Sequence, residues 1–578
     1  MNMKTRYILL AFLSGAAVYA QKEDDNIGTE VVNVVKPYTP TISDAFKVKE
    51  TPSMSDPDNA PKETIEYRIF SFPVASTFTP SKGRAAGVEK SKKETLYDNY
   101  ASLAVGNYGT VLGELYVTQE LDNNSYVAGM LRHHSSAGNI KDTELDDNFM
   151  NSSIDLTYGQ KTKSLSWNAD AGYQYQGYNW YGLPAGFGDA LTEEDRRLLV
   201  GQIDPGHTYH NGYLGGRIAM GDSFFDEATV RFNRFWDTHD AAENRFVLKP
   251  RFGFDIGDTN IKLNAVVDYL GGSFEGEPGA KIDYSFTNFG IHPSVTFSGD
   301  DWSVDFGAAA FYSMDMEGDE SKFFIYPKVN ASYKIVGDLM VFYAGADGDL
   351  QQNSYRDFTN ENPFMASFLA IAPTDRQFEV FAGLKGKLAS SVSYNVRASF
   401  AAENERALIR ATDYNTNILN LDYQYGNSFG VVYDDMTTLG IFGELKADFS
   451  KNVSFGVNGT FNTYSTDAER EAWNLPQIRL GSSLDVNITE KWYAGAQVFF
   501  VGERKDFQVD LDLPFPNGDI FTLDSYFDAN AHVGYKHNDR LTAFVRANNI
   551  ANQTYNRWLN YNVQGFQFLL GASYKFNF

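Results

Sequence analysis

The C-terminal end of the chain alternates regularly between apolar and polar side chains. From residue 565 onward, every second position is apolar or aromatic, and the intervening positions are mostly polar or small: Phe566, Phe568, Leu570, Ala572, Tyr574, Phe576 and Phe578 form the apolar set. Successive side chains of a β-strand point to opposite faces, so this pattern predicts a strand with one apolar and one polar face. A tilted strand of about 9–11 residues crosses a membrane. The alternative, an edge strand of a soluble β-sandwich, would leave an aggregation-prone edge exposed.

The same alternation recurs from residue 97 to the C-terminus and predicts an all-β chain of about 22 strands. One example is the segment near 521–536, in which Leu523, Phe527 and Val533 share the apolar face. The strands are expected near residues 100–107, 111–121, 124–134, 151–160, 163–175, 208–219, 225–236, 243–256, 258–271, 284–298, 301–314, 322–336, 339–348, 377–388, 391–412, 428–449, 452–465, 475–488, 490–503, 521–536, 540–552 and 563–578.

The connections between these segments differ systematically in length. Short turns follow the even-numbered strands, and most connections after the odd-numbered strands are longer, notably 135–150, 176–207, 349–376, 413–427 and 504–520. Outer-membrane barrels have short periplasmic turns and long extracellular loops. The sequence therefore predicts a transmembrane antiparallel β-barrel over residues 97–578 whose two ends both lie on the periplasmic side. A soluble solenoid or propeller would repeat a motif at a fixed period, and none is visible.

Composition agrees with a barrel. The chain has no cysteine, which excludes disulfides and thiolate metal sites, and its formal charge of −25 argues against nucleic acid as a partner. Aromatic residues make up 15% of the chain although its mean hydropathy is negative. This pairing is typical of strands that are polar inside, apolar outside and flanked by aromatic girdles, to which Trp492 and Trp558 are assigned.

The N-terminal part precedes the barrel. Residues 1–20 are predicted to be a secretory signal peptide, with Lys4 and Arg6 ahead of an apolar run and a small-residue cleavage pattern at 17–20. Residues 21–96 are expected to form a periplasmic extension. Within it, a short β-prone run bounded by prolines suits addition as a strand to a partner's sheet edge. It consists of Thr29, Glu30, Val31, Val32, Asn33, Val34 and Val35. The run resembles the TonB box of outer-membrane transporters, and the alternative is an ordinary periplasmic tail.

Several barrel segments resemble the TonB-dependent receptors of Bacteroidetes-type bacteria. They are LYDNYASLAVGNYGT at 96–110, GELY at 113–116, HHSS at 133–136, EAWNLP at 471–476, FFVGER at 499–504 and VRANNIAN at 545–552, followed by Trp558. The aromatic ending Tyr574, Phe576 and Phe578 resembles the terminal signal of bacterial outer-membrane barrels. The resemblance implies location in the outer membrane of a Gram-negative cell. The implied partners are outer-membrane lipid, the barrel-assembly machinery, a TonB-like periplasmic protein and other outer-membrane proteins.

Receptors of this family carry a plug domain between the box and the barrel. Here residues 21–96, rich in proline and charge, leave no room for a compact domain of about 100 residues. We therefore expect the plug to be missing, which puts energised uptake in doubt. One loop could replace it: residues 362–371 are unusually apolar for an exposed connection. Folding into the lumen and docking an extracellular partner are the two ways to bury them.

Candidate chemistry is sparse, and neither an enzyme nor a cofactor is expected. His133 and His134 are adjacent on a strand, so they face opposite sides and cannot share a metal. Four acidic residues could hold Ca²⁺, although a solvated loop is the better interpretation: Asp142, Glu144, Asp146 and Asp147. Residues 192–195 predict a short capped helix that serves as a lid or contact surface. The chain is thus expected to be a receptor-like or transport barrel, or alternatively a non-transporting scaffold subunit of a secretion or barrel-assembly complex.

Overall fold

The computed structural model describes residues 96–578, with the exception of 222, 258, 277–280 and 515–517. The predicted signal peptide at 1–20, the N-terminal extension up to residue 95 and the TonB-box-like residues 29–35 lie outside the described residues. Among the described residues, no helix is both long and apolar enough to cross a membrane.

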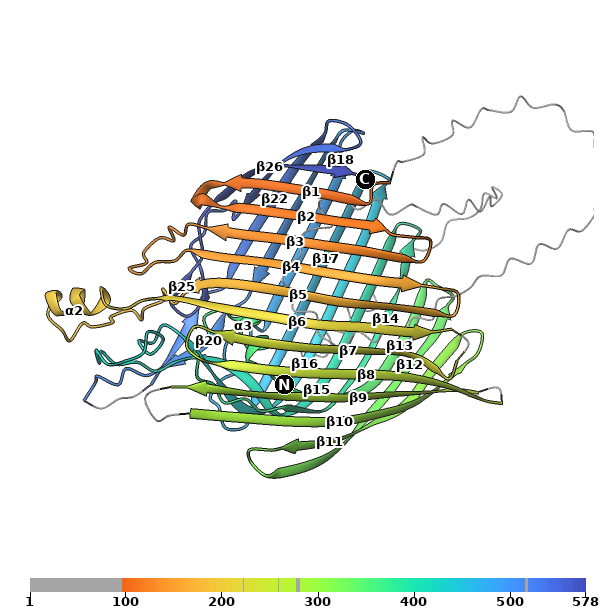
Figure 1. Cartoon of the computed structure of the whole chain (residues 1–578), viewed down its shortest axis with the longest axis horizontal. Helices are drawn as coiled ribbons and strands as arrows, with labels where there is room; N and C mark the ends of the chain where they lie inside the picture. Colours follow the sequence, from red (N-terminus) through yellow and green to blue (C-terminus); the bar gives the residue numbers. More distant parts are fainter. Residues whose placement is uncertain (1–95, 222, 258, 277–280, 515–517) are drawn as a thin grey trace, which may run out of the picture. The chain divides into compact units, whose positions relative to one another are not determined.

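A single 22-stranded sheet dominates the described chain (Figure 1). Its strands are β1 (Asn99–Gly106), β2 (Val111–Glu120), β3 (Ser125–Ser136), β4 (Phe149–Lys161), β5 (Leu165–Asn179), β6 (Gly206–Met220), β7 (Phe225–Asp237), β8 (Ala242–Ile256), β9 (Thr259–Glu275), β10 (Lys281–Ser298), β11 (Trp302–Asp315), β12 (Glu320–Val336), β13 (Met340–Gln351), β14 (Thr374–Ala389), β15 (Val392–Ala411), β16 (Phe429–Ser450), β17 (Val453–Thr466), β18 (Ile478–Asn487), β19 (Trp492–Val501), β22 (Tyr526–Lys536), β23 (Leu541–Asn548) and β26 (Gln567–Phe576).

Smaller elements lie in the connections. They are the 3₁₀ turn η2 (Asn107–Gly109), the helices α2 (Glu193–Val200) and α3 (Tyr355–Glu361), and two hairpins, β20 (Arg504–Gln508) with β21 (Asp519–Leu523) and β24 (Asn556–Trp558) with β25 (Tyr561–Asn562). The short helix expected at residues 192–195 is confirmed as α2, because the Thr192 side chain caps it by accepting from the Asp195 amide.

The sheet closes on itself. Each strand pairs antiparallel with the next, and β1 pairs with β26 in the register Tyr100↔Lys575 to Gly106↔Leu569. Closure leaves no unpaired edge, the condition for a sheet that crosses a membrane. The predicted transmembrane antiparallel barrel and its strand number are thereby confirmed.

The two ends of the barrel differ as predicted (Figure 1). One end, here called the turn end, carries the connections 121–124, 162–164, 221–224, 257–258, 299–301, 337–339, 390–391, 451–452, 488–491 and 537–540. The other, here called the loop end, carries 107–110, 137–148, 180–205, 238–241, 276–280, 316–319, 352–373, 412–428, 467–477, 502–525 and 549–566. Both α2 and α3 belong to loop-end connections.

One predicted strand was wrong in its extent. The segment expected at 521–536 is divided: residues 519–523 belong to the loop-end hairpin β20–β21, and the barrel strand β22 begins only at Tyr526. Leu523, expected on the apolar outer face, is 2% exposed within the loop-end core. Leu523 and Phe527 are four residues apart and so fit one face of a single strand, which is why the two-residue period alone does not show the break.

The outer face of the barrel is apolar. Leu115, Leu131 and Ile154 pair across β2, β3 and β4 and point outward, and comparable outward side chains follow on the other strands. Large exposed apolar side chains include Leu103, Leu214, Val230, Phe232, Phe289, Ile291, Phe306, Phe323, Ile325, Val396, Leu439, Ile441, Leu480, Val498, Phe527, Val533 and Leu570. Such a continuous surface is unstable in water and matches the hydrocarbon of a bilayer.

The inner face is polar and its charges are paired. Arg132 lies 3.2 Å from Asp155, and Arg397 lies 2.5 Å from Glu379. Asp347 contacts two cations, Lys328 at 2.7 Å and Arg376 at 3.0 Å. Paired charges on the inward positions indicate a hydrated lumen, because an apolar interior would impose a large desolvation cost on them.

Candidate functional site

The connection 352–373 folds back into the mouth of the barrel at the loop end. It begins with α3, whose first turn is capped by Ser354, the hydroxyl of which accepts from the Asp357 amide at 3.1 Å. Met365 and Ser367 are completely buried, and Leu369 is nearly so. The inward folding predicted for residues 362–371 is therefore confirmed, and docking of an external partner is not needed to bury them.

Two buried carboxylates on the inner wall hold this connection in place. Glu243 on β8 accepts hydrogen bonds from the Tyr355 amide at 2.7 Å and the Tyr284 hydroxyl at 2.9 Å. Asp237 at the end of β7 accepts from the Tyr355 hydroxyl at 2.7 Å and the Ser367 hydroxyl at 2.6 Å. Burial raises the pKa of Tyr355 well above its ordinary value, so its hydroxyl keeps the proton that it donates.

An ion triad supports the same connection. The Arg245 guanidinium lies 2.7 Å from Asp268 on the neighbouring strand β9 and 3.0 Å from Asp357 in α3. Both Arg245 and Asp268 are largely buried. The triad thus links the barrel wall to the helix in an environment where an unpaired charge is costly.

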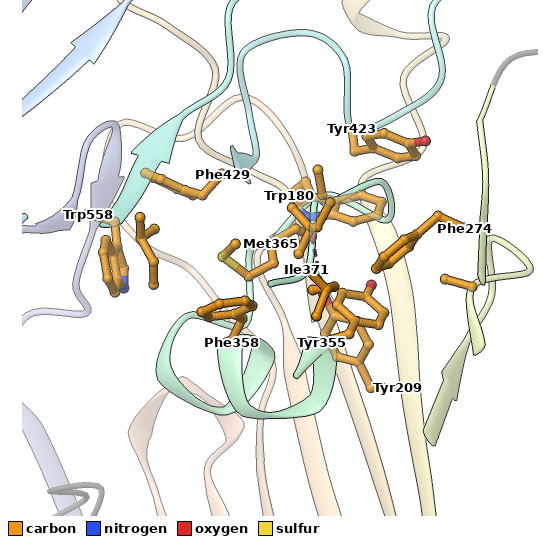
Figure 2. Close-up of a cluster of buried hydrophobic side chains, with 14 of the residues drawn as sticks. Trp180, Tyr209, Phe274, Tyr355, Phe358, Met365, Ile371, Tyr423, Phe429 and Trp558 are labelled. Atoms are coloured by element: carbon orange, nitrogen blue, oxygen red, sulfur yellow. Dashed lines mark hydrogen bonds between the residues drawn. The ribbon is translucent and has the colours of Figure 1, made fainter. Parts of the chain in front are cut away.

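Aromatic side chains fill the space between the inserted connection and the walls (Figure 2). The Tyr209 hydroxyl donates to the Pro363 carbonyl at 3.0 Å, and the Phe364 ring stacks on Tyr561 with centroids 3.8 Å apart. Phe429 contacts Trp558 at 5.5 Å. Side chains from β6, β7, β9, β10, β15 and β16 and from most of the long connections meet in this loop-end core.

A main-chain link crosses the mouth. The Ala366 amide donates to the Phe429 carbonyl at 2.8 Å, and the Phe429 amide donates to the Phe364 carbonyl at 3.0 Å. The connection from β13 to β14 is thereby bonded to the start of β16 as well as to the β6–β9 wall. Loop-end core and link together join the inserted connection to the walls at this end of the barrel.

A buried carboxylate helps to anchor the hairpin β20–β21. Asp506 accepts from the Ala411 amide at 3.0 Å, from the Asn474 side-chain amide at 2.8 Å and from the Phe507 amide at 2.8 Å. Burial raises the pKa of Asp506 from 3.8 to about 6, although these donors and the Arg410 charge oppose the shift.

The raised pKa makes docking of this hairpin pH-dependent. The docked carboxyl binds a proton more readily than the exposed one, so docking strengthens as the pH falls through 6 toward 4. From pH 7.5 to pH 5 we expect about 1 kcal/mol of added local stability. Hydrogen exchange of amides 504–508, corrected for the intrinsic pH dependence, measures it. Asp506→Asn should remove the pH dependence, and an equally strong dependence in that variant would contradict the assignment.

The other residues singled out in the sequence are placed as follows. Tyr574, Phe576 and Phe578 form a row of contacting rings at the turn end, with Tyr574 and Phe578 exposed. His133 and His134 point to opposite faces of the barrel wall. The His133 ring is hydrogen-bonded to the hydroxyls of Ser152 and Ser135 on the outer face, and the His134 ring packs on Phe149. The TonB-box-like residues 29–35 lie outside the described residues.

Two of the acidic residues of the 137–148 connection support the fold. Asp147 accepts from the amides of Asn139 and Ile140, and Glu144 pairs with Arg196 of α2 at 2.6 Å. Within the described residues, no group of three or more His, Asp or Glu side chains could hold a metal ion.

One of the two tryptophans assigned to the girdle was misplaced. Trp492 is 45% exposed near the turn end and contacts Tyr535, as a girdle residue would. Trp558 is 8% exposed and belongs to the loop-end core (Figure 2). It lies in a connection whose inward fold is set by contacts with Phe429, far away in the sequence. Glu243, Asp237 and Tyr355 were not predicted as site residues. The sequence signal was the apolar run at 362–371, which indicated that this loop needs partners that bury it.

Comparisons with known proteins identify the fold. No protein-family model matches the chain, and no curated protein sequence matches it. Solved structures do match. The FrpB iron transporter from Neisseria meningitidis has a TM-score of 0.62 at 11% identity, over 84% of this chain and 83% of that one. The siderophore receptor PirA from Acinetobacter baumannii has 0.60 at 12%, over 84% and 81%.

A third match is the ferric-catecholate import receptor Fiu from E. coli, with a TM-score of 0.59 at 11% identity, over 84% of this chain and 82% of that one. At such low identity the likeness establishes architecture, and chemistry has to be argued from the site itself. The chain therefore has the fold of the outer-membrane receptor barrels: a closed, 22-stranded transmembrane β-barrel, here with a side-chain core packed into its loop end.

Proposed function

We propose that this chain is a receptor-like transport barrel of the Gram-negative outer membrane, of the TonB-dependent kind. The observation that carries the proposal is a closed 22-stranded sheet whose loop end holds a packed core built from the chain's own connections. Porins leave an aqueous channel, whereas 22-stranded outer-membrane transporters have a plugged lumen, and a core packed into the loop end fits the second kind. The matched proteins named as an import receptor and an iron transporter support the same interpretation.

The orientation follows from the connections. The loop end faces the cell exterior and the turn end faces the periplasm, as in bacterial outer-membrane barrels. The start of β1 and the end of β26 meet at the turn end, where the Asp98 amide donates to the Asn577 side chain at 2.8 Å. A TonB-like periplasmic protein would bind on this side, and residues 29–35 precede β1 in the sequence.

The proposal includes a missing plug. The N-terminal extension of 21–96 is too short and too rich in proline and charge for a compact domain of about 100 residues. The inserted connection 352–373 fills part of the lumen instead, and its anchors on Glu243 and Asp237 would be the contacts that cargo uptake releases. The resemblance to Bacteroidetes-type receptors supports this arrangement.

Insertion would use the aromatic terminus. Tyr574, Phe576 and Phe578 sit at the end of the closing strand with their rings in a row, accessible to a factor that binds the strand before β1 pairs with it. The barrel-assembly machinery is the partner that this placement favours, and lipid then covers the outer face.

Deletion of residues 29–35 tests the proposal. We expect the variant to fold and insert normally, to lose binding of the host's TonB-like periplasmic domain in a purified two-component assay, and to lose cellular accumulation of ferric siderophores from a mixed panel. The matched control deletes the seven residues 22–28, which should change neither readout. Unchanged binding in the 29–35 variant would contradict a functional box.

The second candidate is a non-transporting scaffold subunit, and one observation favours it. The loop-end core joins side chains from opposite walls through hydrogen bonds and stacked rings, which suits a rigid support. The two candidates differ in their response to the deletion: a scaffold without residues 29–35 keeps its stoichiometric outer-membrane partners and shows no uptake to lose.

A further inference from the structure

Four large apolar side chains are exposed at the tips of two neighbouring loop-end connections. Leu419 is 81% exposed and Ile418 60% on the 412–428 connection, and Leu511 and Leu513 are exposed on the 502–525 connection. The Thr416 amide donates to the Asp512 carboxylate at 2.8 Å, and the Leu511 amide donates to the Tyr414 carbonyl at 2.8 Å. These four residues, here called the apolar tip, thus sit on loops that are bonded to each other.

The loops that carry the apolar tip are firmly supported. Tyr414 and Tyr425 pack against Phe187, Leu199 and Ile203 of the 180–205 connection. Next to them Gly426 adopts a φ of +73°, and a Cβ at this position would meet the Pro184 ring at 2.7 Å and the Gln508 side chain at 2.9 Å. The loops beneath the apolar tip have buried cores of their own. The four side chains of the apolar tip are therefore exposed on an ordered surface.

The connections that carry and support the apolar tip are rich in acidic residues. Asp510 and Asp512 lie on the same connection as two of its leucines, and the three connections also carry Asp189, Glu193, Glu194, Asp195, Asp204, Asp413, Asp422 and Glu503. Their basic residues are mostly engaged. Arg196 pairs with Glu144, Lys505 pairs with Glu471, and Arg504 is buried against the main chain of the 549–566 connection. Within residues 180–205, 412–428 and 502–514, Arg197 is the remaining basic side chain.

We propose that the apolar tip is the docking surface for a second protein, one that presents a small apolar patch ringed by lysine and arginine. Clustered exposed apolar residues rimmed by charge mark protein interaction sites, and complementary charge steers the encounter. A second copy of this chain fits poorly, because it would bring the same acidic surroundings into contact. An anionic lipid surface is repelled for the same reason. The proposal does not depend on whether the barrel transports.

Site-specific photo-crosslinking in native outer membranes tests the proposal. A photoreactive phenylalanine analogue replaces Leu419 in the full chain, and a control chain carries it at Met316, which is exposed on the 316–319 connection of the same end. We expect one stoichiometric protein adduct from position 419 and none from position 316. The crosslinked peptide of that partner should be rich in lysine and arginine.

Salt and charge supply the second readout. Raising the salt from 50 to 300 mM should lower the adduct yield by roughly fivefold, because screening weakens exposed charge pairs. Asp510→Asn with Asp512→Asn should lower it similarly, since asparagine can still accept from the Thr416 amide but carries no charge. Separately, the double variant Ile418→Ser and Leu511→Ser, probed from position 419, should abolish the adduct while the barrel stays heat-modifiable on gels.

Other outcomes overturn the proposal. They are equal crosslinking from positions 316 and 419, adducts only with lipid or with a second copy of this chain, and a partner adduct insensitive to salt and to all four substitutions. None of these results bears on the deletion of residues 29–35, so failure of the docking proposal and failure of the transport proposal are distinguishable.

Discussion

A chain that lacks residues 21–95 and carries a short Gly-Ser turn in place of residues 353–373 is expected to conduct ions steadily through the barrel. Gln351 on β13 pairs with Thr374 on β14, so a short turn can rejoin the strands without disturbing the sheet. The substitution removes α3 and the apolar run at 362–371, which together form the centre of the loop-end core. What remains is a polar-lined lumen wider than that of porins of about 16–18 strands, which leave an aqueous channel. Single-channel recording in planar bilayers measures the effect.

The matched control is the chain that lacks residues 21–95 but keeps 353–373. It is expected to stay closed, because Ala366 and Phe429 still bond across the mouth and Phe364 still stacks on Tyr561. A control chain that conducts as well as the loop variant would show that the loop-end core does not close the barrel, and the proposed reason for energised opening would then be lost.

Substitution of Arg245 by methionine is expected to release α3 from the barrel wall. Arg245 is 14% exposed at its side chain and lies between Asp268 and Asp357, with the buried Glu243 two residues away on the same strand. Removing one partner from a buried ion pair leaves uncompensated charge and costs about 3–5 kcal/mol. We expect faster hydrogen exchange over residues 354–361 and cleavage of the 352–373 connection by added protease.

Arg251 provides a control on the same strand. It lies 3.3 Å from Glu227, but its side chain is about a third exposed, so water and salt screen the pair. Arg251→Met should therefore cost at most about 1 kcal/mol and leave exchange over 354–361 unchanged. Equal effects of the two substitutions would mean that general charge on the inner wall, and not the buried triad, holds the helix.

The barrel was largely predictable from local pattern. Outward side chains such as Leu570 and Tyr574 were found by counting in twos, and turn lengths assigned the two ends. The failures have a shared cause. Leu523 and Trp558 satisfy the local pattern for a strand face or a girdle, yet both are buried in the loop-end core. Local periodicity reports which side chains share a face but not which environment that face meets.

The sequence predicted only that some part of the chain has to bury the loop 362–371, not which residues form the loop-end core. The apolar run at 362–371 indicated that something must bury it, because an exposed patch of that size is a liability. Which residues do so is set by contacts between distant parts of the chain, such as Tyr355 with Glu243 or Phe364 with Tyr561. No spacing in the sequence relates these positions.

The sequence by itself determined the number of strands, their inward and outward faces and the contrast between short turns and long loops. These features follow from the two-residue period of a strand and from the bilayer's demand for an apolar exterior, both of which act locally. Tertiary structure alone decided that the connection 352–373 folds inward, that Glu243, Asp237 and Arg245 hold it, and that the loops carrying Ile418, Leu419, Leu511 and Leu513 are bonded to each other. These features depend on contacts between connections that are far apart in the sequence and that meet only when the sheet closes. No single segment of the sequence determines them.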